Sequence, residues 1–238
     1  GHVEHIGYQP SLMEGKNKRQ RDQRILESTL SKNPADLYSA LKLLELANYW
    51  SDSTLSERIA HHLLRELELA HPDKLSEHHW GAELLARLAR TLYATAPHQA
   101  LKLLQSYPTT PSMDYLETRG LFFEAAGNPS AAHRDFNAAL KICKEAAHPE
   151  QMQVPSILGL CRLSLASNEI KNARALVNLA VQINPKNPLA LRYDLLIAQL
   201  TGGEPAIRQR FDELRELYGI EVELAKLAPE FGLTATSS

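Results

Sequence analysis

Two short amphipathic helices joined by a tight turn are encoded between Asp114 and Leu140, and this pattern constrains the fold more than any other feature of the chain. The turn falls at Gly127-Asn128-Pro129, residue types that end one helix and begin another. Gly120 lies on the first helix, where a second helix must approach closely. The second helix carries small and large residues at helical intervals: Ala132, Phe136 and Ala139. The stretch therefore predicts a helical hairpin.

These intervals resemble the tetratricopeptide repeat (TPR), a helix-turn-helix unit in which small residues admit the neighbouring helix and large residues fill the gaps. Leu116 takes the place of the usual tryptophan, Arg119 replaces an expected leucine, and Lys144 replaces the closing proline. The resemblance implies a chain of stacked hairpins, in which each hairpin contacts its neighbours along the sequence.

Similar pairs of helical patterns occur on both sides of this stretch. One pair begins at Pro34, a degenerate pair follows it, and two pairs lie after residue 150, the last of them turning at Gly202-Gly203. Residues 219–233 are expected to form a short capping helix, because the last repeat of a solenoid otherwise exposes an apolar face. The predicted fold is all-α: a TPR-like α-α superhelix (solenoid) of about five helix pairs with flanking helices.

The chain is predicted to divide into four parts. Residues 1–14 form an N-terminal extension, in which Gly1-His2 reads as a tag remnant and the following residues as a short strand from the end of a preceding domain. Residues 15–33 form a linking helix, residues 34–228 form the TPR-like repeat domain, and residues 229–238 form a flexible tail.

Charge and hydropathy exclude several classes of partner. The formal net charge is −2, which gives no reason to expect nucleic acid or an anionic membrane as the main partner. The basic stretch from Lys16 to Arg24 is interpreted as a solvated helix face, with a patch that binds phosphate or nucleic acid as the less favoured alternative. No run approaches the roughly 18 apolar residues of a membrane span, and a signal-peptide core is missing. We expect a cytoplasmic protein.

No motif in the sequence indicates catalysis or a bound cofactor. The adjacent pairs His61-His62 and His78-His79 are poor chelates, because neighbouring side chains on a helix point about 100° apart. No H-E-x-x-H or Cys-x-x-Cys motif occurs, and the two cysteines, Cys143 and Cys161, lie in helical patterns typical of buried thiols. The chain is therefore predicted to be non-enzymatic, with no metal site and no cofactor.

The first 38 residues resemble the segment that follows the catalytic domain in bacterial family 2 glycosyltransferases with C-terminal TPR repeats. A His-x-Gly-Tyr element, a basic stretch and an Asn-Pro pair precede the first repeat there. The matching positions here are His5, Gly7, Tyr8, Lys18, Arg21, Asp22, Leu26, Glu27, Asn33 and Pro34, with Asp22 in place of the usual Asn.

This resemblance implies that His5 is the last remnant of a nucleotide-sugar site. Such enzymes also need an Asp-x-Asp element to hold the divalent ion that bridges the sugar diphosphate, and none occurs in the 238 residues. The resemblance therefore implies that this chain is the accessory part of an enzyme whose catalytic domain lies upstream.

The expected working surface is the concave groove lined by the first helix of each pair. Carrying over the ligand-facing positions of TPR proteins predicts a lining of mixed charge with leucines between, able to receive a peptide or protein. The predicted groove residues are Tyr38, Glu45, Asn48, Asp114, Glu117, Leu121, Glu124, Leu158, Arg162, Leu165, Arg192, Leu196 and Gln199.

Three functions stay open from the sequence. The leading one is a non-catalytic interaction module of a bacterial glycosyltransferase, which recruits or orients a protein acceptor. The alternatives are a fragment that contributes directly to a nucleotide-sugar transferase site, and a free-standing scaffold of envelope or secretion assembly.

Overall fold

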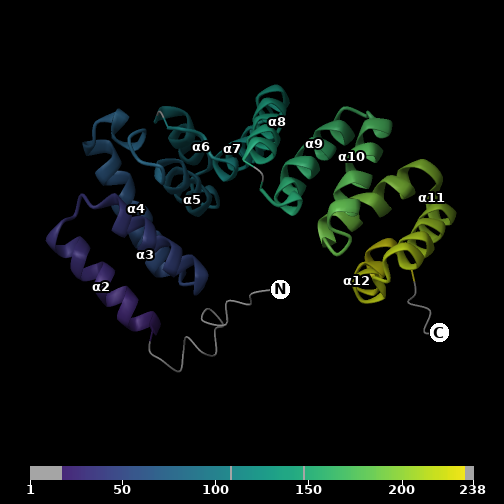
Figure 1. Cartoon of the computed structure of the whole chain (residues 1–238), viewed down its shortest axis with the longest axis horizontal. Coiled ribbons are helices and arrows are strands. Elements are labelled where there is room, and N and C mark those ends of the chain that lie inside the picture. Colours follow the sequence, from purple (N-terminus) through teal and green to yellow (C-terminus); the bar gives the residue numbers. More distant parts are fainter. Residues whose placement is uncertain (1–17, 108, 147, 234–238) are drawn as a thin grey trace. The chain divides into compact units, whose positions relative to one another are not determined.

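The computed structural model describes residues 18–107, 109–146 and 148–233, and every regular element within these ranges is helical (Figure 1). This confirms the predicted all-α fold. The short strand predicted near the N-terminus lies outside the described residues. The helices are α2 (Lys18–Lys32), α3 (Leu37–Tyr49), α4 (Ser53–Leu69), α5 (Gly81–Tyr93), α6 (Pro97–Ser106), α7 (Met113–Ala125), α8 (Pro129–Glu145), α9 (Val154–Ala166), α10 (Ile170–Ile183), α11 (Pro188–Tyr218) and α12 (Glu221–Leu227), with 3-10 turns η2 (Pro72–Leu75), η3 (Glu150–Gln153) and η4 (Ala228–Phe231).

The chain forms two compact units, residues 1–111 and residues 112–238. In the first unit α3 pairs with α4 and α5 pairs with α6, while α2 packs against α3. In the second unit α7 pairs with α8, α9 pairs with α10, and α11 supplies the last pair. The first helices α3, α5, α7 and α9 are each 13 residues long.

Three turns within the pairs share one backbone geometry. Each contains one residue with positive φ after the first helix: Ser51 (54°), Gly127 (73°) and Asn168 (59°). The amide of the next residue donates to the carbonyl oxygen five positions earlier, over 2.8 to 2.9 Å, which satisfies a carbonyl at the helix end. The same local device therefore reverses the chain whether or not a glycine is present.

The last pair is the helix α11, which bends sharply at Gly203. This residue has φ 64° and ψ −152°, a conformation that is open to glycine and strained for other residues. The bend separates an arm that begins at Pro188 from a second arm that ends at Tyr218. The predicted turn at Gly202-Gly203 is thus confirmed.

The first repeat helix begins later than predicted. Pro34 was expected at its first position, but α3 begins at Leu37. The carboxylate of Asp36 accepts a hydrogen bond from the Ser39 amide at 3.0 Å and thereby caps the helix. The start of α3 is thus set by the capping side chain of Asp36 and not by Pro34.

The ring of Phe136 on α8 is held between two glycines. Phe136 is 1% exposed, and a Cβ added at Gly120 on α7 or at Gly159 on α9 would lie 2.8 Å or 2.6 Å from atoms of its ring. One ring therefore fills the space between three helices of two consecutive hairpins. The sequence predicted Gly120 as a close-approach position, but the same role of Gly159 on α9 was not predicted.

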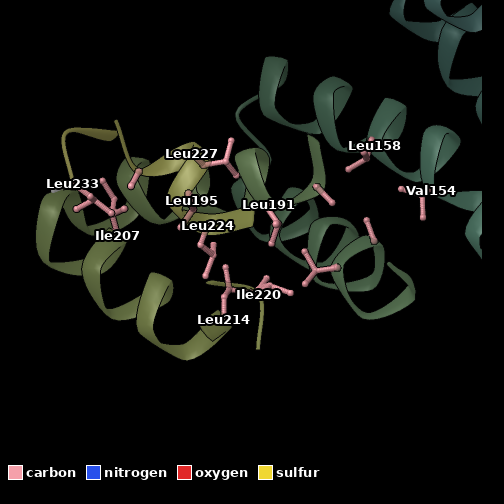
Figure 2. Close-up of a cluster of buried hydrophobic side chains, with 14 of the residues drawn as sticks. Val154, Leu158, Leu191, Leu195, Ile207, Leu214, Ile220, Leu224, Leu227 and Leu233 are labelled. Atoms are coloured by element: carbon pink, nitrogen blue, oxygen red, sulfur yellow. The ribbon is translucent and has the colours of Figure 1, made fainter. Parts of the chain in front are cut away.

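A large apolar cluster closes the second unit at its C-terminal end (Figure 2). Leu191 and Leu195 on the first arm of α11 meet Leu224 and Leu227 on α12, and all four are buried. The predicted capping helix is therefore confirmed. Residues 229–233 were predicted as part of the flexible tail, but η4 continues to Phe231, and Leu233 is only 8% exposed because it joins this cluster.

None of the helices in the described ranges combines the length and the apolar character needed to cross a bilayer.

Removing the Phe136 ring should cost about 3–5 kcal/mol of unfolding free energy, because a cavity would open between two hairpins. Gly159→Ala should cost about 1–3 kcal/mol, since the new methyl group meets the same ring. Urea unfolding followed by circular dichroism measures both losses. Leu179→Ala serves as the control, because Leu179 is 45% exposed on α10. A loss below about 1 kcal/mol for Phe136→Ala would show that the ring does not join the hairpins.

Candidate functional site

The predicted groove residues of the second unit lie on α7, α9 and the first arm of α11, with unequal exposure. Leu121, Arg192 and Gln199 are exposed, whereas Asp114, Glu124, Arg162, Leu165 and Leu196 are half-buried. Two of the predicted residues are buried rather than exposed. Leu158 is 2% exposed because it packs in the cluster with Leu191 and Leu195, and Glu117 is 8% exposed because it faces α9.

The charged groove residues are paired within the unit. Glu117 accepts a hydrogen bond from the hydroxyl of Ser156 at 2.7 Å. Arg192 at the surface donates to both carboxylate oxygens of Glu230, with Nε at 2.8 Å from Oε2. The charged side chains that the sequence predicted as ligand contacts thus largely bind other helices of the unit.

A further ion pair joins the first helices of neighbouring hairpins. Arg162 on α9 donates bidentate hydrogen bonds to the carboxylate of Glu124 on α7, with Nε at 2.9 Å from Oε1 and one terminal nitrogen at 2.8 Å from Oε2. Burial disfavours the charged guanidinium, but the bonds to Glu124 and to Tyr193 outweigh it and raise the pKa of Arg162. We refer to Glu124, Arg162 and Tyr193, which connect α7, α9 and α11, as the polar ladder.

An ion pair also explains the departure from the TPR pattern at Arg119. Its guanidinium binds both oxygens of Asp135 on α8, at 2.7 and 2.8 Å, where a repeat of the usual type has an apolar contact. The charged group lies over the rings of Tyr115 (5.1 Å) and Phe123 (6.0 Å). The substitution therefore preserves the joint between the two helices by a different interaction.

A fully buried carboxylate, which the sequence reading missed, fixes the last two hairpins. Asp194 is 0% exposed, and it accepts hydrogen bonds from Arg174 on α10 at 2.6 Å and from Arg210 on the second arm of α11 at 2.8 Å. The one sign of this site in the sequence is an aspartate within an apolar helical run. The sequence does not show which residues pair with it, because its partners come from two other helical segments.

Once the charges are paired, the unit presents leucines beside the polar ladder. Leu121 lies one helical turn before Glu124, Leu165 lies one turn after Arg162, and Leu196 lies one turn after Tyr193, so they share the ladder's face of each helix. Leu200, one turn beyond Leu196, was not predicted and is 60% exposed. We call these four residues, Leu121, Leu165, Leu196 and Leu200, the leucine face.

In the first unit the three predicted residues lie on α3. Tyr38 is 46% exposed, Glu45 forms ion pairs with Lys42 and Arg87, and exposed Asn48 accepts a hydrogen bond from the Ser56 hydroxyl at 2.9 Å. This face is aromatic and charged, in contrast to the leucine face of the second unit.

In the described ranges no group of three or more His, Cys, Asp or Glu side chains is placed to hold a metal ion. Both cysteines are buried. Burial raises the pKa of the Cys161 thiol to about 11, which disfavours the reactive thiolate at neutral pH.

Comparison with known proteins identifies the fold. No family model matches the sequence, and no curated protein matches it. The structure is similar to that of PilW, a widely conserved type IV pilus biogenesis factor, with a TM-score of 0.63, 15% identity and coverage of 94% of this chain and 99% of PilW. The likeness to pilF of Pseudomonas aeruginosa has a TM-score of 0.60 and 16% identity over 92% of both chains.

A third similar structure is YrrB, described as a TPR protein with an unusual peptide-binding site. It matches with a TM-score of 0.57 and 10% identity, over 84% of this chain and 96% of YrrB. At these identities the likeness concerns the fold, which is a TPR-type solenoid.

Replacing Arg162 with alanine should cost about 1–3 kcal/mol, because it leaves a half-buried Glu124 without its partner. A double-mutant cycle with Glu124→Ala, measured by urea unfolding, isolates the coupling between the two side chains. The matched control is the exposed pair of Arg208 and Glu204 on α11, whose coupling should stay below about 1 kcal/mol. Equal coupling in both pairs would contradict a special role for the polar ladder.

Both cysteines should resist a thiol-specific reagent in the native protein at pH 8, because they are buried and because burial keeps the Cys161 thiol protonated up to a pKa of about 11. Both should react at once in denaturant. Fast titration of one native thiol would show that its helix opens readily.

Proposed function

We propose that this chain is a non-catalytic protein-protein interaction module, and that the leucine face of the second unit binds a peptide or protein partner. The observation that carries the proposal is that the polar ladder neutralises its own charges while Leu121 and Leu200, 43% and 60% exposed, stay open to solvent. Exposed apolar residues next to satisfied polar groups are typical of a surface that a partner covers.

The chemistry of the face favours an amphipathic helix as the ligand. Leu196 and Leu200 lie one turn apart on one helix, and Leu165 lies on the neighbouring first helix beside the cluster that also supports Tyr193. The apolar face of an amphipathic helix, with side chains at intervals of three and four residues, can pack against such a row of leucines. Gln199, exposed between them, offers one amide for a polar contact at the margin.

The similar structures support this class of function without specifying the partner. YrrB is described as having a peptide-binding site, and PilW is described as a type IV pilus biogenesis factor. The alternative of a free-standing scaffold in envelope or secretion assembly is therefore retained as a second candidate.

We further propose that residues 34–228 act as the C-terminal repeat domain of a bacterial glycosyltransferase in the cytoplasm, where they recruit or orient a protein acceptor. The support is the run from His5 to Pro34, which resembles the segment between catalytic domain and repeats in such enzymes. A direct contribution to the nucleotide-sugar site is the less favoured form of this proposal, because the sequence contains no Asp-x-Asp element.

In a pull-down from a lysate of the source organism, the double variant Leu121→Arg, Leu200→Arg should retain less than half of the partner protein that the unaltered chain retains. Circular dichroism checks that both proteins are folded. The control carries Leu179→Arg and Leu217→Arg, which change equally exposed leucines elsewhere in the unit and should retain the partner. Identical retention by all three chains would remove the leucine face as the binding site.

The partner identified in this way also separates the two candidate contexts. A glycosylated partner, together with an upstream Asp-x-Asp domain in the source gene, would support the transferase context. An unglycosylated component of an envelope assembly would support the scaffold.

A further inference from the structure

A groove of the second unit is lined by one face each of α8, α9 and α10, which follow one another along the chain (Figure 1). Its volume of about 630 Å³ lies in the range of natural ligand sites. On α9 the lining residues are 160, 163, 164 and 167, which lie on the opposite side of the helix from Arg162 and Leu165. We call this site the α8–α10 groove, and it shares no residue with the leucine face.

One part of the α8–α10 groove is apolar. Leu160 and Leu163 on α9 and Leu176 on α10 line it, and all three pack in the cluster that contains Phe136. Leu160 and Leu163 keep 7% and 8% of their surface exposed. This part of the groove can therefore receive an apolar side chain.

Two asparagines bring hydrogen-bonding groups to the lining. The Asn137 amide on α8 donates to the His133 carbonyl at 2.8 Å, and the Asn172 amide on α10 donates to the Ser164 hydroxyl at 2.8 Å. Among the described residues, no donor is bound to the side-chain oxygen of either asparagine. These two oxygens can accept hydrogen bonds from the backbone N–H groups of a peptide.

Arg134 on α8 gives the groove a positive charge that the unit does not neutralise. It is exposed, and within the described part of the chain it has neither an ion pair nor a side-chain hydrogen bond. The other arginines of the second unit each bind a carboxylate: Arg119, Arg162, Arg174, Arg192, Arg208, Arg210 and Arg215. Arg134 is thus the arginine of this unit that is left for an external anion.

The carboxylate among the described lining residues belongs to Glu169, and its charge is partly compensated. Glu169 accepts a hydrogen bond from the Asn172 amide at 3.4 Å. It also precedes the first turn of α10, where the positive end of the helix dipole stabilises a negative group. Arg134 lies in the second turn of α8, near the end of the dipole that does not favour a cation. The groove therefore favours a ligand with a single negative group.

We propose that the α8–α10 groove binds an extended segment of a partner protein in which an apolar residue and an acidic residue stand two positions apart. The apolar side chain packs on Leu160, Leu163 and Leu176. The carboxylate accepts two hydrogen bonds from the Arg134 guanidinium, whose planar shape suits such a contact. In an extended chain two residues at this spacing point to the same side, roughly 6.6 Å apart.

The lining argues against other ligand classes. A nucleic acid would bring phosphates beside Glu169 and would cover the leucines with a polar backbone. A fatty acid would match Arg134 and the leucines, but it would cover the oxygens of Asn137 and Asn172 without donating a hydrogen bond to them. A peptide supplies all three kinds of contact. The inference does not depend on the leucine face or its partner.

The test titrates the full chain into a fluorescein-labelled peptide with an amidated C-terminus, Ala-Glu-Ala-Leu-Ala-Leu-Ala-Glu-Ala, and follows fluorescence anisotropy. The two glutamates allow the segment to bind in either direction. We expect saturable binding that weakens at least about tenfold when lysine replaces both glutamates, because Arg134 then meets a like charge. Serine in place of both leucines should also weaken binding at least about tenfold, since no leucine is then buried.

Variants locate the site. Arg134→Gln should weaken binding of the glutamate peptide about fivefold, and Arg134→Glu should reverse the preference toward the lysine peptide. The matched control is Lys144→Gln, which removes an exposed cation of α8 outside the groove and should bind like the unaltered chain. The leucine-face variant Leu121→Arg, Leu200→Arg should also bind like the unaltered chain.

Circular dichroism checks the fold of each variant. If an Arg134 variant is unfolded, the lysine and serine peptides still test the proposal on the unaltered chain. The absence of saturable binding would overturn the proposal, as would equal binding of the lysine peptide. Unchanged binding by folded Arg134→Gln would do so too. Loss of binding in the leucine-face variant alone would move the peptide to that face and would equally refute the assignment.

Discussion

The close approach of three helices around the Phe136 ring is the contact on which the second unit depends. A helical hairpin cannot bury its apolar face alone, so its stability comes from the next hairpin. Gly120 and Gly159 leave room on both sides of the ring, and Phe136 fills that room almost completely. If Gly120 and Gly159 carried side chains, α7, α8 and α9 would have to move apart, and the ion pairs between these helices would lengthen.

That spacing brings the charged side chains of neighbouring first helices into hydrogen-bonding range. Glu124 meets Arg162, Glu117 meets Ser156, and Asp194 is enclosed by arginines from two other helical segments. Each of these contacts is made within the unit, and each withdraws charge from the surface that a partner would meet. The second unit is rich in charges at these positions, yet the ion pairs leave exposed leucines such as Leu121 and Leu200 beside them.

The two units consequently offer different chemistry on equivalent helices. On α3 the outward residues are tyrosines with Lys42 and Glu45 between them, and the aromatic rings are braced by Trp80 and Trp50. On α7, α9 and α11 the outward residues are leucines beside the polar ladder. A chain of repeats can in this way carry surfaces of different chemistry without any change of fold, because surface positions of a hairpin are free to vary once its core is packed.

The sequence by itself determined the elements of this protein. Helical periodicity, the Gly127-Asn128-Pro129 turn, the pair of glycines at residues 202 and 203 and the capping segment all act locally, and local propensity is what a sequence displays directly. The tertiary structure decided which side chains stay exposed. Leu158 and Leu121 occupy similar predicted positions, yet one is covered by α11 and the other is open, because burial depends on the helix that packs above. Spacing shows the direction of a side chain, and only the packed neighbours show what it meets.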